Sequence, residues 1–192
     1  MTVQAHEGVK PARRRLHVDF HTLGPLVALI LLCLLGFALN PAFISEGNIS
    51  NLLTRSAFIG IIAVGGTFVI TAGGIDLSVG SMAAVISGVM IIVMNAAIDT
   101  LGTGLATVIL GCVASVVLGL GAGFLNGFMT TKGKIEAFIV TLGTMGIFRS
   151  LVTYFADGGT LSLAFDIRDT YRPVYYGNLL GVPVPVVVFA LV

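Results

Sequence analysis

Charged residues and tryptophan are scarce in this chain of 192 residues, and their scarcity excludes several classes of protein. Charged residues make up 10% of the sequence, hydrophobic residues make up 56%, and tryptophan is absent. Because a soluble domain carries about 25% charged residues, this chain has too few to cover a surface that faces water. The net charge of +1 also excludes a strong basic field of the kind that attracts nucleic acid. Lipid is therefore the expected solvent for most of the surface.

Residues that hold metals or catalyse reactions are equally sparse. Cys33 and Cys112 lie in separate apolar runs without a Cys-x-x-Cys or Cys/His spacing, which predicts inert thiols. The three histidines, His6, His17 and His21, lie near arginines in a polar segment, where we expect them to be solvated or interfacial. No phosphate-binding GxxxxGK[ST] loop, HExxH or GxSxG motif occurs. We therefore expect no enzyme activity, no metal site and no cofactor bound by this chain.

Long apolar runs predict an all-α, polytopic transmembrane helical bundle. A helix needs about 20 residues to cross the hydrocarbon core. By this measure the sequence predicts five complete spans, at residues 23–39, 56–72, 77–97, 104–128 and 137–155. The final run, 182–192, is about half of a crossing and would begin a sixth span. We therefore expect a cytoplasmic N-terminal segment at 1–22 and a transmembrane domain at 23–192 that is the first part of a longer protein.

The distribution of lysine and arginine predicts the orientation. Cytoplasmic loops carry an excess of these residues. Four of them precede the first span and place the N-terminus in the cytoplasm: Lys10, Arg13, Arg14 and Arg15. Four crossings then return Lys132 and Lys134 to the cytoplasmic side, whereas a single crossing over 56–97 would leave them outside. The charge pattern thus favours a helical hairpin over 56–97 and an outer location for the polar segment 156–181.

The hairpin turns at the string Ala-Gly-Gly-Ile-Asp-Leu-Ser-Val-Gly-Ser, residues 72–81. An aspartate at bilayer depth costs about 2.5–3.5 kcal/mol on insertion scales, so its presence needs a reason. In one interpretation, Gly73 or Gly74 ends a helix in the left-handed conformation, and Asp76 caps the next helix through the amide of Ser78 or Val79. In the other, freed backbone groups line a polar path within the membrane, together with Asp76, Ser78 and Ser81. The two interpretations are compatible.

Small residues recur at every fourth position of the predicted fourth span. Such a stripe predicts close helix packing, and its members are Gly111, Ser115, Gly119, Gly123 and Gly127. Near the end of the same span, Asn126 is expected to bond a neighbouring helix or cap a turn, with contact to a solute as the alternative. Arg149 is the basic residue predicted at depth in the fifth span. It snorkels to the interface, pairs with a carboxylate, or indicates that the bounds of this span are off by a turn.

Several strings in this sequence closely resemble the permease subunits of bacterial ABC importers for monosaccharides, the family of ribose-, xylose-, arabinose- and galactose-type permeases. The resemblance starts at Ile-Gly-Ile-Ile-Ala-Val-Gly-Gly-Thr-Phe-Val-Ile, residues 59–70, and is most specific at Gly-Gly-Ile-Asp-Leu-Ser-Val-Gly-Ser, residues 73–81. It continues through the Leu-Asn-Gly that ends residues 121–127 and through Ala-Phe-Ile-Val-Thr-Leu-Gly-Thr, residues 137–144, followed by Arg149. It covers most of residues 48–151.

This resemblance implies a multi-pass permease of the bacterial inner membrane that moves a monosaccharide by alternating access. It implies three partners: a second permease subunit, identical or different; a cytoplasmic ATPase with tandem nucleotide-binding domains, which would hold ATP and Mg²⁺; and a periplasmic sugar-binding protein, docked in part by 156–181. It also suggests Gly73, Gly74, Asp76, Ser78, Ser81 and Asn126 as residues of the pathway or its hinges. A secondary carrier or facilitator without an ATPase and a membrane scaffold are the alternatives. The sequence does not identify the sugar.

Overall fold

The computed structural model describes residues 20–192, which fall into a first unit ending at Ile49 and a second unit from Ser50 to Val192. Residues 1–19 of the predicted cytoplasmic segment 1–22 lie outside the described residues, as do the four basic residues that predict its orientation and the histidines His6 and His17. The outcome of those predictions is therefore not visible in the fold, and the two units are described separately.

In the first unit, helix α1 (Phe20–Leu39) meets a short 3-10 helix, η1 (Pro41–Ile44), at a polar turn. The Asn40 side chain accepts a hydrogen bond from the Ala42 amide (3.0 Å) and so caps η1. The Phe43 ring then folds back on Gly36, where an added Cβ would lie 3.0 Å from the ring. This contact fixes the direction in which the chain leaves α1.

Helix α2 (Glu46–Thr71) continues from the first unit into the second and begins well before the span predicted at 56–72. The Ser45 hydroxyl accepts a bond from the Asn48 amide (3.4 Å), which marks a helix start at the polar residues that the sequence predicted as a connection. The polar residues 46–55 therefore belong to the helix and do not mark its absence.

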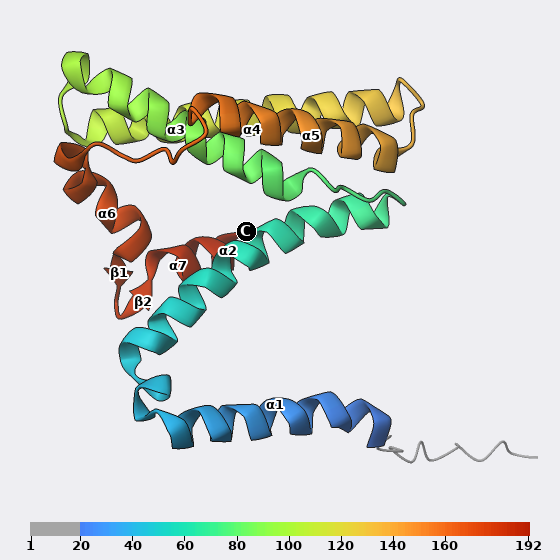
Figure 1. Ribbon diagram of the computed structural model, residues 1–192, viewed down its shortest axis with the longest axis vertical. Coiled ribbons are helices and arrows are strands. Elements are labelled where there is room, and N and C mark those ends of the chain that lie inside the picture. The colour runs from blue at the N-terminus through green and yellow to red at the C-terminus, as the bar shows by residue number, and fades with distance from the viewer. Residues whose placement is uncertain (1–19) are drawn as a thin grey trace, which may run out of the picture. The chain divides into compact units, whose positions relative to one another are not determined.

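In the second unit, α3 (Val79–Leu101), α4 (Leu105–Thr131) and α5 (Ala137–Phe155) pack together as one bundle (Figure 1). Val85, Ala122 and Phe148 form an apolar cluster with one residue from each helix. Most other large apolar side chains remain exposed, for example Leu120 at 70% and Phe124 at 73%. A soluble protein would bury such side chains, so these faces are suited to lipid or to other membrane segments.

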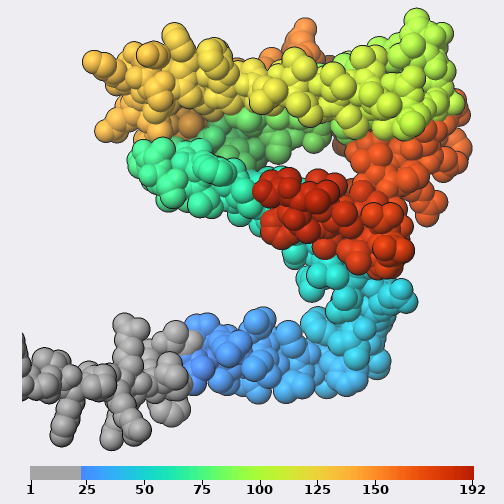
Figure 2. All heavy atoms as spheres, turned by 180° about the vertical axis from the view of Figure 1, so that it is seen from behind, coloured from blue at the N-terminus to red at the C-terminus, as the bar shows by residue number. Residues whose placement is uncertain are grey.

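Within residues 20–192, α2 to α5 are long and apolar enough to cross a membrane, and α1 adds the shorter apolar run Leu23–Leu39. The predicted all-α polytopic bundle is thereby confirmed. Its fifth span, predicted at 137–155, coincides with α5. The run predicted to begin a sixth span contains α7 (Val184–Leu191), a helix of 8 residues that lies against α2, where Phe189 contacts Gly60 (Figure 2).

The polar segment 156–181, which the sequence predicts to be an outer loop, is largely folded. It contains η2 (Phe165–Ile167), α6 (Arg168–Tyr176) and β1 (Asn178–Leu179), and β1 pairs antiparallel with β2 (Val182–Pro183). The two residues between the strands, Leu180 and Gly181, both have positive φ (53° and 84°), as a tight hairpin turn of the primed type requires.

Apolar residues spaced four apart hold this segment to the bundle. Ile167 is fully buried with Met94 of α3 and Val108 of α4, and Leu163 and Tyr171 pack at the edge of the same cluster. The side chain of Asn95 on α3 donates to the Ser162 carbonyl (3.0 Å) and accepts from the Ala164 amide (2.9 Å). The segment is thus anchored by both an apolar and a polar contact.

Replacing Asn95 with alanine should loosen the anchored segment without unfolding the bundle. The change removes both bonds to the segment, at a cost of about 1–2 kcal/mol. The population of the form in which the segment has detached from the bundle should therefore rise about five- to thirtyfold. Tryptic cleavage after the exposed Arg168 measures this opening in detergent-solubilised protein. Thr100→Val is the control, because the Thr100 hydroxyl bonds only within its own helix. Equal cleavage rates for both variants would contradict the assigned role of Asn95.

Two glycines of α4 should respond oppositely to alanine. A Cβ at Gly111 would lie 2.5 Å from Met94 Cγ, whereas a Cβ at Gly123 meets nothing within 4 Å. Gly111→Ala should therefore destabilise the bundle by about 1–3 kcal/mol through overpacking. Gly123→Ala should stabilise it by about 0.5–1 kcal/mol through helix propensity. Unfolding in mixed micelles measures both, and shifts of the same sign would refute the close approach of α3 and α4.

Candidate functional site

The break between α2 and α3 begins with a glycine turn. Gly73 has φ +81°, its amide donates to the Ile70 carbonyl (2.9 Å), and the Gly74 amide donates to the Val69 carbonyl (2.9 Å). This pattern is a Schellman motif, in which a left-handed residue pairs the last carbonyls of a helix. It matches the conformation that the sequence predicted for Gly73 or Gly74.

The carboxylate of Asp76 organises the start of α3. Its Oδ1 accepts from the Ser78 amide (2.7 Å) and from the Ser78 hydroxyl (2.6 Å). The first of these is the capping bond that the sequence predicted. Ser78 is fully buried, and its carbonyl accepts from the Ser81 hydroxyl (2.9 Å).

Side chains of α4 and α5 complete the site. Asn126 Nδ2 donates to the Ser78 hydroxyl oxygen (3.0 Å), and the Leu77 amide donates to Thr141 Oγ1 (3.1 Å). Thr141 Oγ1 in turn lies 2.7 Å from the Ala137 carbonyl and 3.2 Å from the Ile75 carbonyl, and has one proton to donate to either. We call Asp76, Ser78, Asn126 and Thr141 the polar junction, since they join the break to two further helices.

The polar junction is buried and almost fully hydrogen-bonded. Ser78, Asn126 and Thr141 are 0%, 6% and 3% exposed, and Asp76 is half-buried. Within residues 20–192, Asn126 Oδ1 is the buried side-chain oxygen that lacks a partner. Because an unpaired buried polar group costs about 1–3 kcal/mol, the remaining bonds must hold this amide in place.

The junction lies near the end of the bundle where α4 connects to α5. A Cβ added at Gly74 would lie 3.3 Å from Ala137 Cβ at the start of α5, and Figure 1 shows the α2–α3 break beside the α4–α5 connection. Thr141 is one turn into α5, about 6 Å from its first residue. The backbone therefore forms the turn of the first interpretation, with polar side chains buried one turn inside it.

Ser81 differs from the other predicted site residues because it lines a cavity. With Leu77, Gly80 and Ala84 it lines a cavity of about 450 Å³ between α3 and α5, and Arg149 is among the residues that line the α5 side. Asp76, Ser78 and Asn126 are occupied with bonds to one another, and the polar path of the second interpretation stays a prediction.

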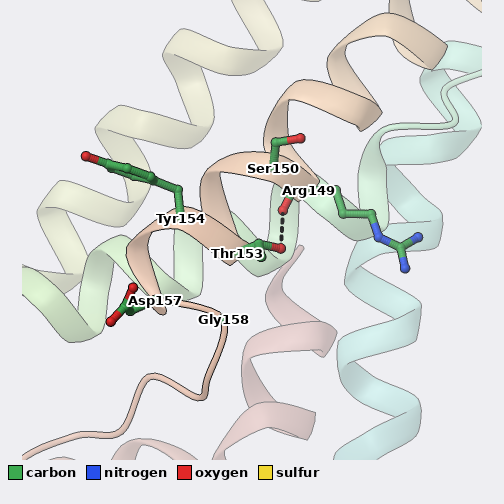
Figure 3. Close-up of a pocket in the computed structure, with 6 residues that line it drawn as sticks. All are labelled: Arg149, Ser150, Thr153, Tyr154, Asp157 and Gly158. Carbon is green, nitrogen blue, oxygen red and sulfur yellow. Dashed lines mark hydrogen bonds between the residues drawn. The ribbon is translucent and has the colours of Figure 1, made fainter.

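Arg149 also borders a second cavity, of about 560 Å³, at the end of α5 (Figure 3). Ser150, Thr153, Tyr154, Asp157 and Gly158 line it as well. In Figure 3 the guanidinium of Arg149 points away from Asp157. Arg149 is exposed and forms no ion pair within residues 20–192, so its snorkelling stays a prediction.

The predicted packing stripe of α4 divides into two halves. Gly111 lies against Met94, and a Cβ at Gly119 would lie 3.3 Å from Ile86 Cδ1, so this half faces α3. Ser115 is half-buried between them, and its hydroxyl donates to the Gly111 carbonyl (2.8 Å).

In the other half of the stripe, Gly123 and Gly127 have nothing within 4 Å of an added Cβ. Ala122 and Asn126, each one position earlier, are buried in their place. The face of α4 that meets α3 thus shifts by one residue along the helix, and the small residues of the second half are exposed.

Sequence reasoning missed Thr141 and Asn95, which make the contacts between distant segments. Each is a polar residue within an apolar helix. This isolation could have identified them from the sequence, since polar side chains in membrane helices face hydrogen-bond partners. Their partners lie 64 to 69 residues away in the sequence, so no local pattern identifies them.

Comparison with known proteins agrees with the fold. The family model described as "Branched-chain amino acid transport system / permease component" matches residues 48–173, which include the whole polar junction. The ribose import permease protein RbsC of Bacillus subtilis (strain 168) is 37% identical over 187 residues, covering 96% of this chain and 55% of that protein. No solved structure matches significantly.

Two further relatives are from Escherichia coli (strain K12). Its ribose import permease protein RbsC is 32% identical over 168 residues, 87% of this chain and 50% of that protein. Its xylose transport system permease protein XylH is 36% identical over 162 residues, 81% of this chain and 39% of that protein. The chain therefore spans about half the length of the curated relatives it matches.

These relatives confirm the resemblance to monosaccharide permeases that the string at residues 73–81 suggested. The apolar helices are those of a multi-pass membrane protein. Since the family model covers more than half of the sequence, the chain belongs to the family described as "Branched-chain amino acid transport system / permease component".

Proposed function

We propose that this chain is part of the membrane-spanning permease subunit of an ATP-driven importer, which carries a monosaccharide across the bacterial inner membrane by alternating access. The polar junction is the observation that carries the proposal, since it fixes a helix break against two neighbouring helices within the region that matches the family. The relatives named for ribose import and xylose transport support a sugar as the substrate.

In this proposal the chain itself hydrolyses no nucleotide. ATP and Mg²⁺ act in a separate cytoplasmic ATPase with tandem nucleotide-binding domains, and a periplasmic protein delivers the sugar. A second permease subunit completes the pathway. Gly73 and Gly74 serve as the hinge, Asp76, Ser78 and Asn126 hold the hinge to the bundle, and Ser81 lies on the pathway beside the cavity of about 450 Å³.

Replacing Asp76 with alanine tests the mechanism. The change leaves the Ser78 amide and hydroxyl without their acceptor, so the start of α3 should lose its fixed position, and uptake should fall to background. Uptake of labelled ribose and xylose is measured in cells that contain the full-length permease, the ATPase and the binding protein. Asp99→Ala is the matched control, because this carboxylate is exposed at the other end of α3.

Immunoblots of the membrane fraction check that both variants insert equally. Normal uptake by the Asp76→Ala protein would remove Asp76 from the mechanism. Uptake that needs neither the binding protein nor the ATPase, and that resists vanadate, would instead indicate a secondary carrier. A complete absence of uptake by the unmodified protein would indicate the remaining alternative, a membrane scaffold that does not transport.

The proposed orientation has a separate test by cysteine labelling. In a background with Cys33 and Cys112 replaced by alanine, Asp169→Cys should react with a membrane-impermeant maleimide in intact spheroplasts. Lys132→Cys and an N-terminal tag should be reached only after permeabilisation. Four crossings, an even number, lie between the N-terminus and Lys132, so both are expected in the cytoplasm. Labels for Lys132→Cys and the N-terminus on opposite sides of the membrane would remove the hairpin from the proposal.

A further inference from the structure

A third cavity, of about 670 Å³, lies between α3 and the segment that contains α6. Three of the four tyrosines of the chain line it, with two arginines and one aspartate. We call it the aromatic cavity and define it by these residues: Arg168, Asp169, Tyr171, Arg172, Tyr175 and Tyr176. The opposite wall comes from Ser87, Met90 and Ile91 of α3 and is mostly apolar.

Contacts with the rest of the second unit hold this cavity open. The Thr170 hydroxyl donates to the Thr103 carbonyl (2.7 Å) and ties α6 to the connection between α3 and α4. The Tyr175 ring stacks on Phe58 of α2, with centroids 5.5 Å apart. With Ile167 buried beneath α6, the walls are fixed before any ligand arrives, which lowers the cost of binding.

The cavity presents polar groups that the protein itself leaves largely unused. Within residues 20–192, the hydroxyls of its three tyrosines make no hydrogen bond, and no ion pair joins Asp169 to either arginine. Arg168 uses its Nε to donate to the Leu163 carbonyl (3.0 Å), which leaves its terminal nitrogens free. The guanidinium of Arg172 lies 6.0 Å from the centre of the Tyr176 ring.

Tyr171 retains its proton at physiological pH. Burial raises the pKa of its phenol above the usual value of 10.0, and the neighbouring Cys112 adds to the effect. The hydroxyl can therefore donate a hydrogen bond as well as accept one.

This combination of groups suits a neutral molecule with several hydroxyls. Aromatic faces accept the apolar C–H face of a ring, while guanidinium and carboxylate groups bond pairs of neighbouring hydroxyls. Asp169 between the two arginines reduces the attraction for an anion. The volume of about 670 Å³ falls in the range of about 300–1,000 Å³ that small-molecule sites occupy.

We propose that the aromatic cavity binds a monosaccharide on the α6 side of the bundle, before the sugar reaches the polar junction. The choice of ligand rests on the proposed permease function. The predicted orientation puts 156–181 outside, so the site would receive sugar at the outer face.

The absence of tryptophan makes the test direct, because tyrosine then dominates the fluorescence and three of the four tyrosines line the cavity. The purified chain, in a zwitterionic detergent without sugar groups, is titrated with D-ribose and with D-xylose. We expect a saturable change in emission. Arg172→Ala should weaken binding about tenfold by removing a charged hydrogen-bond donor. Tyr154→Phe, which removes the tyrosine on α5, should leave the affinity unchanged.

Tyr175→Phe is a second test in which misfolding is not expected, because the variant keeps the ring stacked on Phe58 and removes only the hydroxyl. It should weaken binding by a smaller factor than Arg172→Ala. Three results would overturn the proposal: no saturable change with either sugar, a change that Arg172→Ala and Tyr175→Phe both leave intact, or a response to inorganic phosphate in place of sugar. ATP-dependent uptake without binding here would remove this inference alone. Binding without ATP-dependent uptake would keep the inference and remove the ATP-driven importer.

Discussion

The pairing of polar groups at the break between α2 and α3 is the constraint on which the rest of the structure depends. A helix that ends near hydrocarbon leaves amides and carbonyls that cost several kcal/mol each if unpaired. Here the turn at Gly73 pairs the last carbonyls of α2, and Asp76 pairs the Ser78 amide. The Leu77 amide finds its acceptor on α5, in Thr141. The break therefore needs a neighbouring helix to be stable, and it sets where that helix lies.

The apolar core follows from this placement because polar and apolar contacts share the same helix faces. Ser78 and Val85 lie seven residues apart on α3, as do Thr141 and Phe148 on α5, and residues about two turns apart face the same way. On α4, Ala122 precedes the Asn126 of the junction by one turn. The hydrogen bonds of the junction thus align the three residues that form the apolar cluster, with Val85, Ala122 and Phe148 meeting next to it.

The features that the sequence predicts correctly depend on residues close to one another in the chain. The bounds of α5 follow from apolar length, and the Asp76 cap follows from a spacing of two. The predicted start of α2 was wrong because its first polar residues were assigned to a connection. In the structure the Ser45 side chain caps the helix that contains them. The fold of 156–181 was missed because its apolar residues, four apart, are diluted by charges. The bond from Asn126 to Ser78 spans 48 residues and has no local signature.

The two glycines of the break differ in a way that bears on the proposed hinge. Gly74 is close-packed, with an added Cβ 3.3 Å from both Val69 and Ala137, whereas Gly73 is open. Positive φ carries no steric penalty for glycine, so the backbone at Gly73 can change while Gly74 stays against α5. Within residues 20–192, no side-chain hydrogen bond links α2 itself to α3, α4 or α5, whereas the junction links the residues just before α3 to α4 and to α5. In the proposed mechanism α2 and the bundle move as separate rigid bodies about Gly73, and this motion would have to part the Tyr175 ring from Phe58 of α2.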